Sequence, residues 1–435
     1  MIPLPKGFRF AAIHSGLRSE PNRLDLALIV SDRPAQAVGV FTQNRFRAAP
    51  VLLCQERLPS TQMRGIVICS GNANACTGEQ GKQDAERMAE LLAQSLKCSP
   101  EQVLVASTGV IGRPLPMEVM EKGIPNAFPL LSDNADSVHQ AARAILTTDT
   151  RTKITYSTFT VPNSSHRETK SPGSLNDHSP EKGEKSTTTY TILGIAKGAA
   201  MIGPNMATML GFILTDAPIA AQRLQPILQR AADRTFNCIS VEGHTSTNDT
   251  VLLLANGLST FSENSGTLID SVVPGRGEIS AAEEERFARE IEAVCQRLAH
   301  EIVADAEGGK HIIRLQVQGC RSFEEARTIA KTVANSALVK TAVYGADPNW
   351  GRFVSAAGYS SIPFDIHQLS LWLGVMKLFE KGMPLPFDAA LASAYLKNHV
   401  EVTLRFQFGE GDADCTFYTS DLTPEYVHLN ADYTT

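Results

Sequence analysis

Apolar and polar positions along the chain fall into blocks with two different periods, which predict a mixture of strands and helices. Apolar runs at 26–30 and 37–41 flank the turn-like segment 31–34, so two strands joined by a turn are expected there. Residues 153–161 and 188–195 alternate with a period of two and predict the strands of one hairpin. The first half of the chain is therefore expected to be rich in sheet structure.

Helical spacing is clearest from 281 to about 305. Five apolar residues recur there at three- or four-residue spacing and predict one buried face: Phe287, Ile291, Val294, Leu298 and Ile302. Similar spacing at 85–96 and 220–232 predicts two further helices, whereas 400–435 reads as short strands. Strands and helices alternate too irregularly for a doubly wound sheet or a barrel, so an α+β fold, or a layered αββα sandwich, fits best.

Residues 163–186 lie between the two strands of the predicted hairpin and have a different composition. They are mainly Ser, Thr, Lys, Glu, Asn and Pro, with Leu175 as their only aliphatic residue. A segment of this kind has too little apolar surface to contribute to a core. We expect it to be a flexible surface insertion.

A turn signal near the middle of the chain places a hydroxyl at the start of an apolar run. Gly203, Pro204 and Asn205 indicate the turn, and Thr208 opens the run 209–214, which is apolar enough for a buried strand. Taken alone, this pattern is more typical of a threonine that merely begins a strand. The alternative is chemical, because such a hydroxyl could attack the carbonyl of Ala207, and the freed α-amine could then serve as its base.

A second short motif, Ser107-Thr108-Gly109, ends the predicted strand 103–106. A glycine directly after a strand lets the backbone turn and expose an N–H group, and a neighbouring hydroxyl adds another donor. Thr108 and Gly109 could therefore form an oxyanion hole. By itself, a strand followed by Thr-Gly is usually only a turn.

The segment 197–210 closely resembles the self-cleavage region of the ornithine acetyltransferase family of arginine biosynthesis. Further matches occur in the family's order over nearly the whole chain. They include Val40-Phe41-Thr42-Gln43-Asn44, Ser70-Gly71-Asn72-Ala73-Asn74-Ala75-Cys76-Thr77-Gly78, Thr147-Thr148-Asp149-Thr150, Thr245-Ser246-Thr247-Asn248-Asp249-Thr250 and Asn430-Ala431-Asp432-Tyr433-Thr434-Thr435.

The resemblance implies a layered αββα fold similar to the β-peptidyl aminopeptidase group, with a smaller C-terminal α/β lobe from about residue 320. It also implies cleavage between Ala207 and Thr208, which divides the chain into residues 1–207 and 208–435. Thr208 would then be the nucleophile, with Thr108 and Gly109 as the oxyanion hole. The residues implied to bind substrate are Thr147, Lys197, Thr208, Glu307, Asn430 and Thr435.

The activity implied by the resemblance is transfer of an acetyl group from N-acetylornithine to glutamate, with acetyl-CoA as an additional donor in some relatives. The expected assembly is a heterotetramer of two alpha and two beta chains. No cofactor is expected. Two features depart from the family pattern: Gly308-Gly309-Lys310-His311 follows Glu307, and Glu242-Gly243-His244 stands where relatives have Asp-Gly-Asp. We assign no role to His244.

The composition mainly argues against certain classes of protein and site. The chain has 435 residues, of which 43% are hydrophobic and 20% charged, and a net charge of −6, which gives no indication of a nucleic-acid partner. The eight cysteines lack metal-ligand spacing and are expected to be reduced core residues, so no metal site is expected. Without a signal-peptide pattern or an apolar run long enough to span a membrane, a cytoplasmic location is expected.

Two other classes of protein remain open at this point. An amidase or aminopeptidase of the same layered fold would let water resolve the acyl-enzyme. A binding protein with an intact chain would need no nucleophile at all. Self-cleavage separates the binding protein from the two enzymes, and transfer to glutamate separates the two enzymes from each other.

Overall fold

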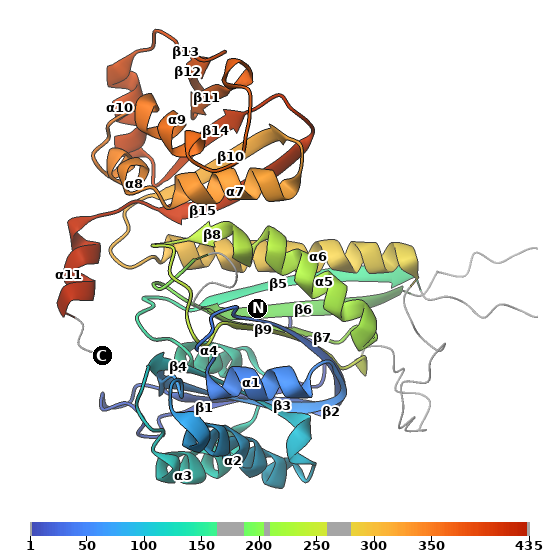
Figure 1. Ribbon diagram of the computed structural model, residues 1–435. Helices are drawn as coiled ribbons and strands as arrows, with labels where there is room; N and C mark the ends of the chain where they lie inside the picture. Colours follow the sequence, from blue (N-terminus) through green and yellow to red (C-terminus); the bar gives the residue numbers. More distant parts are fainter. Residues whose placement is uncertain (1, 163–186, 204–208, 259–279, 433–435) are drawn as a thin grey trace, which may run out of the picture.

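The computed structural model describes residues 2–162, 187–203, 209–258 and 280–432, which form two lobes, one above the other in Figure 1. The larger lobe contains strands β1 (Phe8–Ile13), β2 (Leu26–Phe41), β3 (Ser60–Asn72), β4 (Val103–Val110), β5 (Lys153–Pro162), β6 (Thr187–Lys197), β7 (Leu210–Thr215) and β9 (Thr250–Ala255). Its helices are α1 (Ala49–Arg57), α2 (Gly78–Leu96), α3 (Met117–Ala127), α4 (Ala135–Ala144), α5 (Ala221–Arg234) and α6 (Ala281–Ala304).

The long strand β2 connects two layers of one hydrogen-bonded sheet. Its residues 26–30 pair with β1 and β3, whereas its residues 36–41 pair with β9. Beyond β9 the order continues through β7, β6 and β5. The prediction of a turn at 31–34 is wrong, because β2 stays extended there. Its pairing register with β3 shifts between Val30 and Ala35, and again between Ala35 and Ala37, as β2 changes partners.

Three apolar clusters define the order of the layers. One lies between the two parts of the sheet and joins Phe10 and Ile68 of the first part to Phe212 and Leu252 of the second. Helices α2 and α3 cover the outer face of the first part, and α5 and α6 cover the outer face of the second (Figure 1). The predicted α+β fold with αββα layers is therefore confirmed.

The smaller lobe is built on a second sheet, with strand order β13-β12-β11-β14-β10-β15-β8. The strands are β8 (Ile239–Ser240), β10 (Ile312–Cys320), β11 (Ser370–Leu373), β12 (Met376–Glu380), β13 (Met383–Pro384), β14 (Glu401–Gln407) and β15 (Ala413–Ser420). Helices α7 (Phe323–Ala334), α8 (Ala337–Tyr344), α9 (Trp350–Gly358) and α10 (Ala389–Asn398) contribute side chains to its apolar core. The final helix α11 (Pro424–Asp432) returns toward the larger lobe (Figure 1).

Local sequence signals account for most of these elements. The hairpin expected at 153–161 and 188–195 is confirmed as the antiparallel pair β5 and β6. The helix expected from 281 is confirmed as α6, and Ser280 caps it by accepting a hydrogen bond from the Glu283 N–H at 3.3 Å. The prediction of strands throughout 400–435 is partly wrong, because residues 424–432 form α11.

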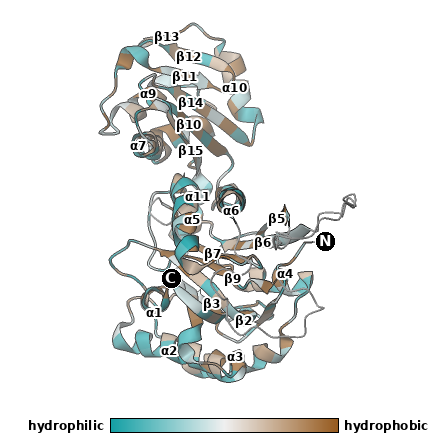
Figure 2. Cartoon of the chain, turned by 90° about the vertical axis from the view of Figure 1, so that its right-hand side faces the viewer, coloured by the Kyte–Doolittle hydropathy of each residue, from teal (hydrophilic) through white to brown (hydrophobic). Residues whose placement is uncertain are grey.

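Hydrophobic residues are found in the strands, and hydrophilic residues on helix surfaces that face solvent. Figure 2 shows hydrophobic segments in the strands of both sheets and hydrophilic residues along α2, which faces solvent on one side. In the described ranges, six of the eight cysteines are buried and none forms a disulfide. None of the described helices is both long enough and apolar enough to cross a membrane.

Candidate functional site

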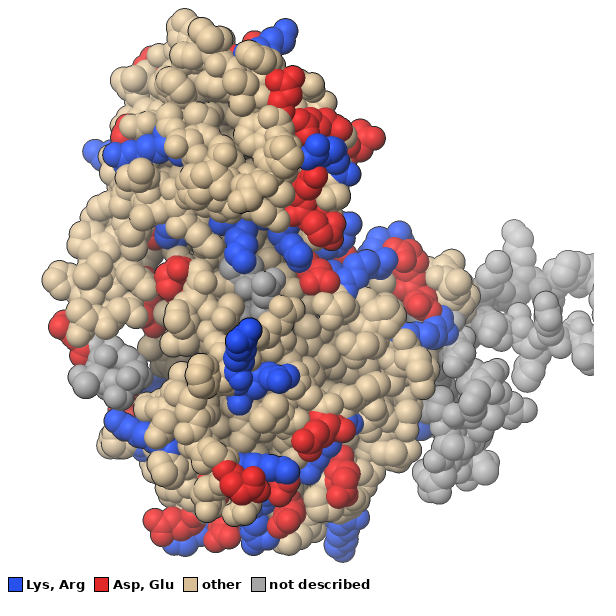
Figure 3. Space-filling model, viewed as in Figure 1, with Lys and Arg blue, Asp and Glu red and all other residues tan. Residues whose placement is uncertain are grey.

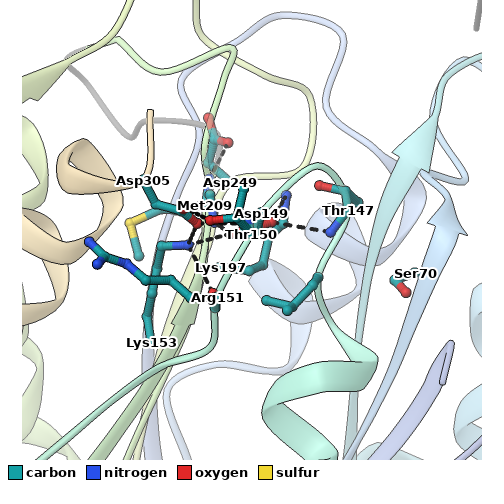
Figure 4. Close-up of polar contacts among 12 residues, drawn as sticks. Ser70, Thr147, Asp149, Thr150, Arg151, Lys153, Lys197, Met209, Asp249 and Asp305 are labelled. Carbon is teal, nitrogen blue, oxygen red and sulfur yellow. Dashed lines mark hydrogen bonds and ion pairs between the residues drawn. The ribbon is translucent and has the colours of Figure 1, made fainter. Parts of the chain in front are cut away.

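Four charged side chains meet where the ends of β5, β6 and α6 come together (Figure 4). Lys153 places its Nζ 2.7 Å from Asp149 Oδ1 and 2.6 Å from Asp305 Oδ2, and its side chain is fully buried. Thr150 donates its backbone N–H to Asp305 at 3.1 Å. Because buried carboxylates need a partner charge, Lys153 holds the two aspartates together.

Lys197 is the second cation of this cluster and is held more loosely. It is 3% exposed, and its Nζ lies 3.9 Å from Asp149 Oδ2. Burial lowers the pKa of Lys197, and the nearby Asp149 carboxylate partly raises it again. Lys153 pairs more closely with Asp149 than Lys197 does, so the Lys197 ammonium group keeps hydrogen-bonding capacity that Asp149 does not use.

Asp149 connects several segments that the sequence analysis singled out. Its carboxylate accepts hydrogen bonds from the Thr147 N–H at 3.1 Å and from the Gly198 N–H at 2.6 Å. Burial acts to raise the pKa of Asp149, but Lys197 and Lys153 outweigh it and hold the pKa at about 2. The ionised Asp149 therefore brings Thr147 and Lys197, two of the expected substrate-binding residues, into one site.

The segment before β9 links the two layers of the sheet at this site. Asn248 donates from Nδ2 to the carbonyl oxygens of Ala73 and Ser107, at 2.6 and 2.8 Å. The adjacent Asp249 accepts the N–H of Met209, the residue after Thr208, at 3.2 Å. Sequence reasoning assigned no role to Asn248 or Asp249, although both lie in the family motif Thr245-Ser246-Thr247-Asn248-Asp249-Thr250.

Asp249 is a fully buried carboxyl group with little polar compensation. Its Oδ1 accepts from Met209 and from the Ser246 hydroxyl, while Oδ2 has no hydrogen-bond partner among the described residues. Burial raises its pKa well above the ordinary value for aspartate.

A pair of substitutions tests whether Asp249 acts through its acceptor oxygen. Asp249→Asn should change the free energy of unfolding by less than about 1 kcal/mol, because the amide keeps an acceptor oxygen for the Met209 N–H and places no charge in the buried position. Asp249→Ala should cost about 1–3 kcal/mol, since the Met209 N–H and the Ser246 hydroxyl lose their acceptor. Urea unfolding at pH 7 measures both, and an equal loss in the two variants would show that the acceptor oxygen does not account for the stability that Asp249 contributes.

Thr108 and Gly109 lie at the end of β4, which runs parallel to β3. Thr108 is 6% exposed, and Gly109 has φ of 132°, a conformation that favours glycine. A Cβ atom at Gly109 would lie 2.3 Å from the carbonyl carbon of Gly71. The close approach of β3 therefore requires glycine at this position.

Glu307 and Asn430 are brought together from distant parts of the chain. Asn430 of α11 donates from Nδ2 to Glu307 Oε2 at 3.2 Å. The backbone N–H of Glu307 donates to the carbonyl of Ala199 at 3.0 Å, two residues after Lys197. The loop also meets the C-terminal segment through Asp421, which accepts the backbone N–H of Lys310 at 2.8 Å.

Other residues singled out from the sequence lie elsewhere. Ala207, Thr208 and Thr435 are outside the described residues, as is the segment 163–186. His244 is exposed. In the part of the chain that the structure describes, no group of three or more His, Cys, Asp and Glu side chains could hold a metal ion.

Together, these features define a layered α+β protein with a buried cluster of charged side chains where β5, β6 and α6 meet. The chain belongs to the ArgJ family, whose model matches residues 9–170 and 177–435. It is 43% identical over 444 residues to the arginine biosynthesis bifunctional protein ArgJ 1 of Nostoc sp., covering 100% of this chain and 98% of that protein. It is 41% identical over 435 residues to the ArgJ protein of Dehalococcoides mccartyi, covering 100% and 97%.

The predicted resemblance to the ornithine acetyltransferases of arginine biosynthesis is confirmed by this family membership. Among solved structures, the chain is similar to the crystal structure of the arginine biosynthesis bifunctional protein ArgJ from Bacillus halodurans. The two are 33% identical, with a TM-score of 0.46 over 51% of this chain and 98% of that chain.

Proposed function

We propose that this protein is a self-cleaving acyltransferase that moves an acetyl group from N-acetylornithine to glutamate by a ping-pong mechanism. Membership in the ArgJ family gives the class of activity. The observation that carries the proposal is the placement of Lys197, Thr147 and the segment at Met209 in one buried site. Such a site suits a small amino acid with a charged carboxylate.

In the first step the hydroxyl of Thr208 attacks the carbonyl carbon of Ala207. The peptide bond shifts to an ester, and water hydrolyses that ester, which frees Thr208 as a new N-terminal residue. The products are an alpha chain, 1–207, and a beta chain, 208–435. The freed α-amine then serves as the base for the hydroxyl of the same residue.

In the second step Thr208 attacks the acetyl carbonyl of N-acetylornithine, and ornithine leaves as the free amine with a proton. Thr108 and Gly109 donate hydrogen bonds to the oxyanion of the tetrahedral intermediate. The amine of glutamate then attacks the acetyl-threonine ester and restores the Thr208 hydroxyl. No further cofactor is needed for this exchange.

The remaining expected residues hold the amino-acid part of the substrate. Lys197 pairs with its carboxylate, and Glu307 pairs with its ammonium group. Thr147, Asn430 and the terminal Thr435 complete the pocket. The contact between Asn430 and Glu307 supports this arrangement, because it places the C-terminal segment beside the proposed ammonium site.

Three further statements belong to this proposal. Acetyl-CoA serves as a second acetyl donor for glutamate, as the name bifunctional implies for the relatives. The cleaved chains assemble as a heterotetramer of two alpha and two beta chains. The enzyme works in the cytoplasm, where the substrates of amino-acid biosynthesis occur.

One assay separates this function from the alternative, an amidase or aminopeptidase of the same layered fold. Purified protein is incubated with N-acetylornithine, with and without glutamate, and the products are identified by mass spectrometry. A transferase forms N-acetylglutamate in the presence of glutamate. Release of acetate and ornithine at the same rate with or without glutamate would support the amidase.

Glu307→Gln should leave self-cleavage intact and weaken acetyl transfer. Glutamine has nearly the same shape and keeps an acceptor oxygen for Asn430, but it has no charge to pair with the ammonium group of the substrate. We expect kcat/KM for N-acetylornithine to fall by roughly tenfold to a hundredfold, equivalent to about 1.5–3 kcal/mol. Steady-state kinetics with glutamate in excess measure this change.

A matched control is Glu285→Gln, because Glu285 is an exposed residue of α6 that pairs with Arg230 at 3.5 Å. It should leave kinetics and cleavage unchanged. Thermal unfolding of both variants shows whether Glu307 is only structural. Normal kinetics combined with a lowered melting temperature would remove Glu307 from the substrate site.

A further inference from the structure

A groove of about 400 Å³ in the larger lobe is lined by none of the residues of the candidate site. One wall is the segment that follows β2 together with α1, and the other is the start of α2. Its lining includes the side chains of Arg45, Phe46, Arg47, Cys76 and Lys82. Figure 3 shows a small group of basic side chains near the position of α1 in Figure 1, with acidic side chains below it on the same face.

The first wall of the groove is tied to the segment that contains Asn248 and Asp249. Asn44 donates from Nδ2 to the carbonyl of Thr245 at 3.0 Å. A few residues later, the N–H of Ala48 donates to the carbonyl of Thr247 at 2.9 Å. The groove therefore opens directly beside the loop that joins the two layers.

The second wall is tied to the segment around Thr108 and Gly109. Residues 72 to 75 precede Cys76, and the Ala75 carbonyl accepts the N–H of Gly112 at 2.9 Å. The N–H of Ala49 donates to the carbonyl of Asn74 at 3.2 Å, which joins the two walls. The groove is therefore one loop away from the segment that contains Thr108 and Gly109.

The chemistry of the groove suits a nucleotide. Phe46 is 71% exposed and lies between two arginines in sequence, so its ring offers an apolar face flanked by cations. Arg45, Arg47 and Lys82 outnumber the two carboxylates that also line the groove, Glu56 and Glu79. Purine rings stack on aromatic faces, and phosphates bind arginine and lysine side chains.

We propose that this groove binds the nucleotide end of acetyl-CoA, the second acetyl donor. The adenine ring stacks on Phe46, the phosphates pair with Arg45, Arg47 and Lys82, and the pantetheine arm points toward the segment that contains Thr108 and Gly109. This inference rests on the proposed function. The Thr208 hydroxyl attacks the thioester carbonyl, CoA leaves as the thiol with the proton, and the acetyl-threonine ester is the same intermediate as in the exchange.

The double variant Arg45→Glu/Arg47→Glu tests the groove. KM for acetyl-CoA, measured with glutamate as acceptor, should rise roughly tenfold or more because two phosphate contacts are lost and replaced by repulsion. Self-cleavage and kcat/KM for N-acetylornithine should stay within about twofold of the wild type, since neither needs the groove. Arg230→Glu/Arg289→Glu, two exposed arginines of α5 and α6, is the charge-matched control and should change none of these values.

Direct binding gives a second readout. Isothermal titration of the cleaved wild type with CoA should show binding that the Arg45→Glu/Arg47→Glu variant lacks and that Phe46→Ala weakens. An unchanged KM for acetyl-CoA in the double variant, or equal losses with both donors, would overturn the proposal. So would a wild type that exchanges acetyl groups normally but neither binds CoA nor uses acetyl-CoA. Failure of the proposed function itself would appear differently, as absent exchange with N-acetylornithine.

Discussion

The variant Thr208→Ala is expected to accumulate as one uncleaved chain of 435 residues without acetyl-transfer activity. Alanine has no hydroxyl group to attack the Ala207 carbonyl, so the peptide bond stays intact and the acetyl-enzyme cannot form. The wild type should instead give two fragments, residues 1–207 and 208–435. Loss of a covalent nucleophile typically lowers kcat on the order of 10⁴-fold or more.

Two further variants sharpen this experiment. Thr208→Ser keeps a hydroxyl nucleophile and should still cleave, more slowly. Thr158→Ala removes an exposed threonine of β5 and should cleave and react as the wild type does. Intact mass spectrometry and the acetyl-transfer assay are done on the same preparations, and full activity in a wild type that consists only of intact chain would refute the mechanism.

Lys153→Met is expected to cause the largest loss of stability among single substitutions near the site. The change keeps an unbranched side chain but leaves the carboxylates of Asp149 and Asp305 buried without the cation that now lies within 2.7 Å of both. Removing one partner from a buried ion pair costs about 3–5 kcal/mol, because the remaining charge is left uncompensated. Urea unfolding followed by fluorescence measures this difference.

The control for Lys153→Met is Lys82→Met. The Lys82 side chain is 53% exposed and reaches Glu86 only at 4.0 Å, so the substitution should change stability by less than about 0.5 kcal/mol. If both variants unfold at the wild-type urea midpoint, Lys153 does not hold the cluster together. A second consequence is expected at the site, because Asp149 also binds the N–H groups of Thr147 and Gly198.

Short local patterns indicated only part of the candidate site. The strand that ends in Thr-Gly allowed an oxyanion hole but was more typical of a turn, and the family resemblance implied the role of Thr108 and Gly109. The structure explains the glycine by its φ of 132° and the close approach of Gly71. Lys197 and Glu307 were implied by the family resemblance. The structure buries Lys197 and places Glu307 against Asn430.

Other parts of the site gave no local signal. Lys153 fits the alternating pattern of a surface strand, yet its partner Asp305 lies 152 residues further along the chain. Asp249 looks like an ordinary polar residue of a turn, and only its burial against the start of β7 makes it chemically unusual. Which charges pair depends on which strand ends meet in the fold. The alternation of residues within a single strand does not predict that.

The sequence by itself determined the family, the main helices, the β5–β6 hairpin and the glycine at the end of β4, because each depends on residues that are close together in the chain. Only the tertiary structure decided that β2 runs through the expected turn at 31–34 and joins two layers. It also decided that 424–432 forms a helix that brings Asn430 to Glu307. The physical reason is that strand partners and buried charge pairs are chosen by contacts between distant segments, where the free energy of burial outweighs local preference.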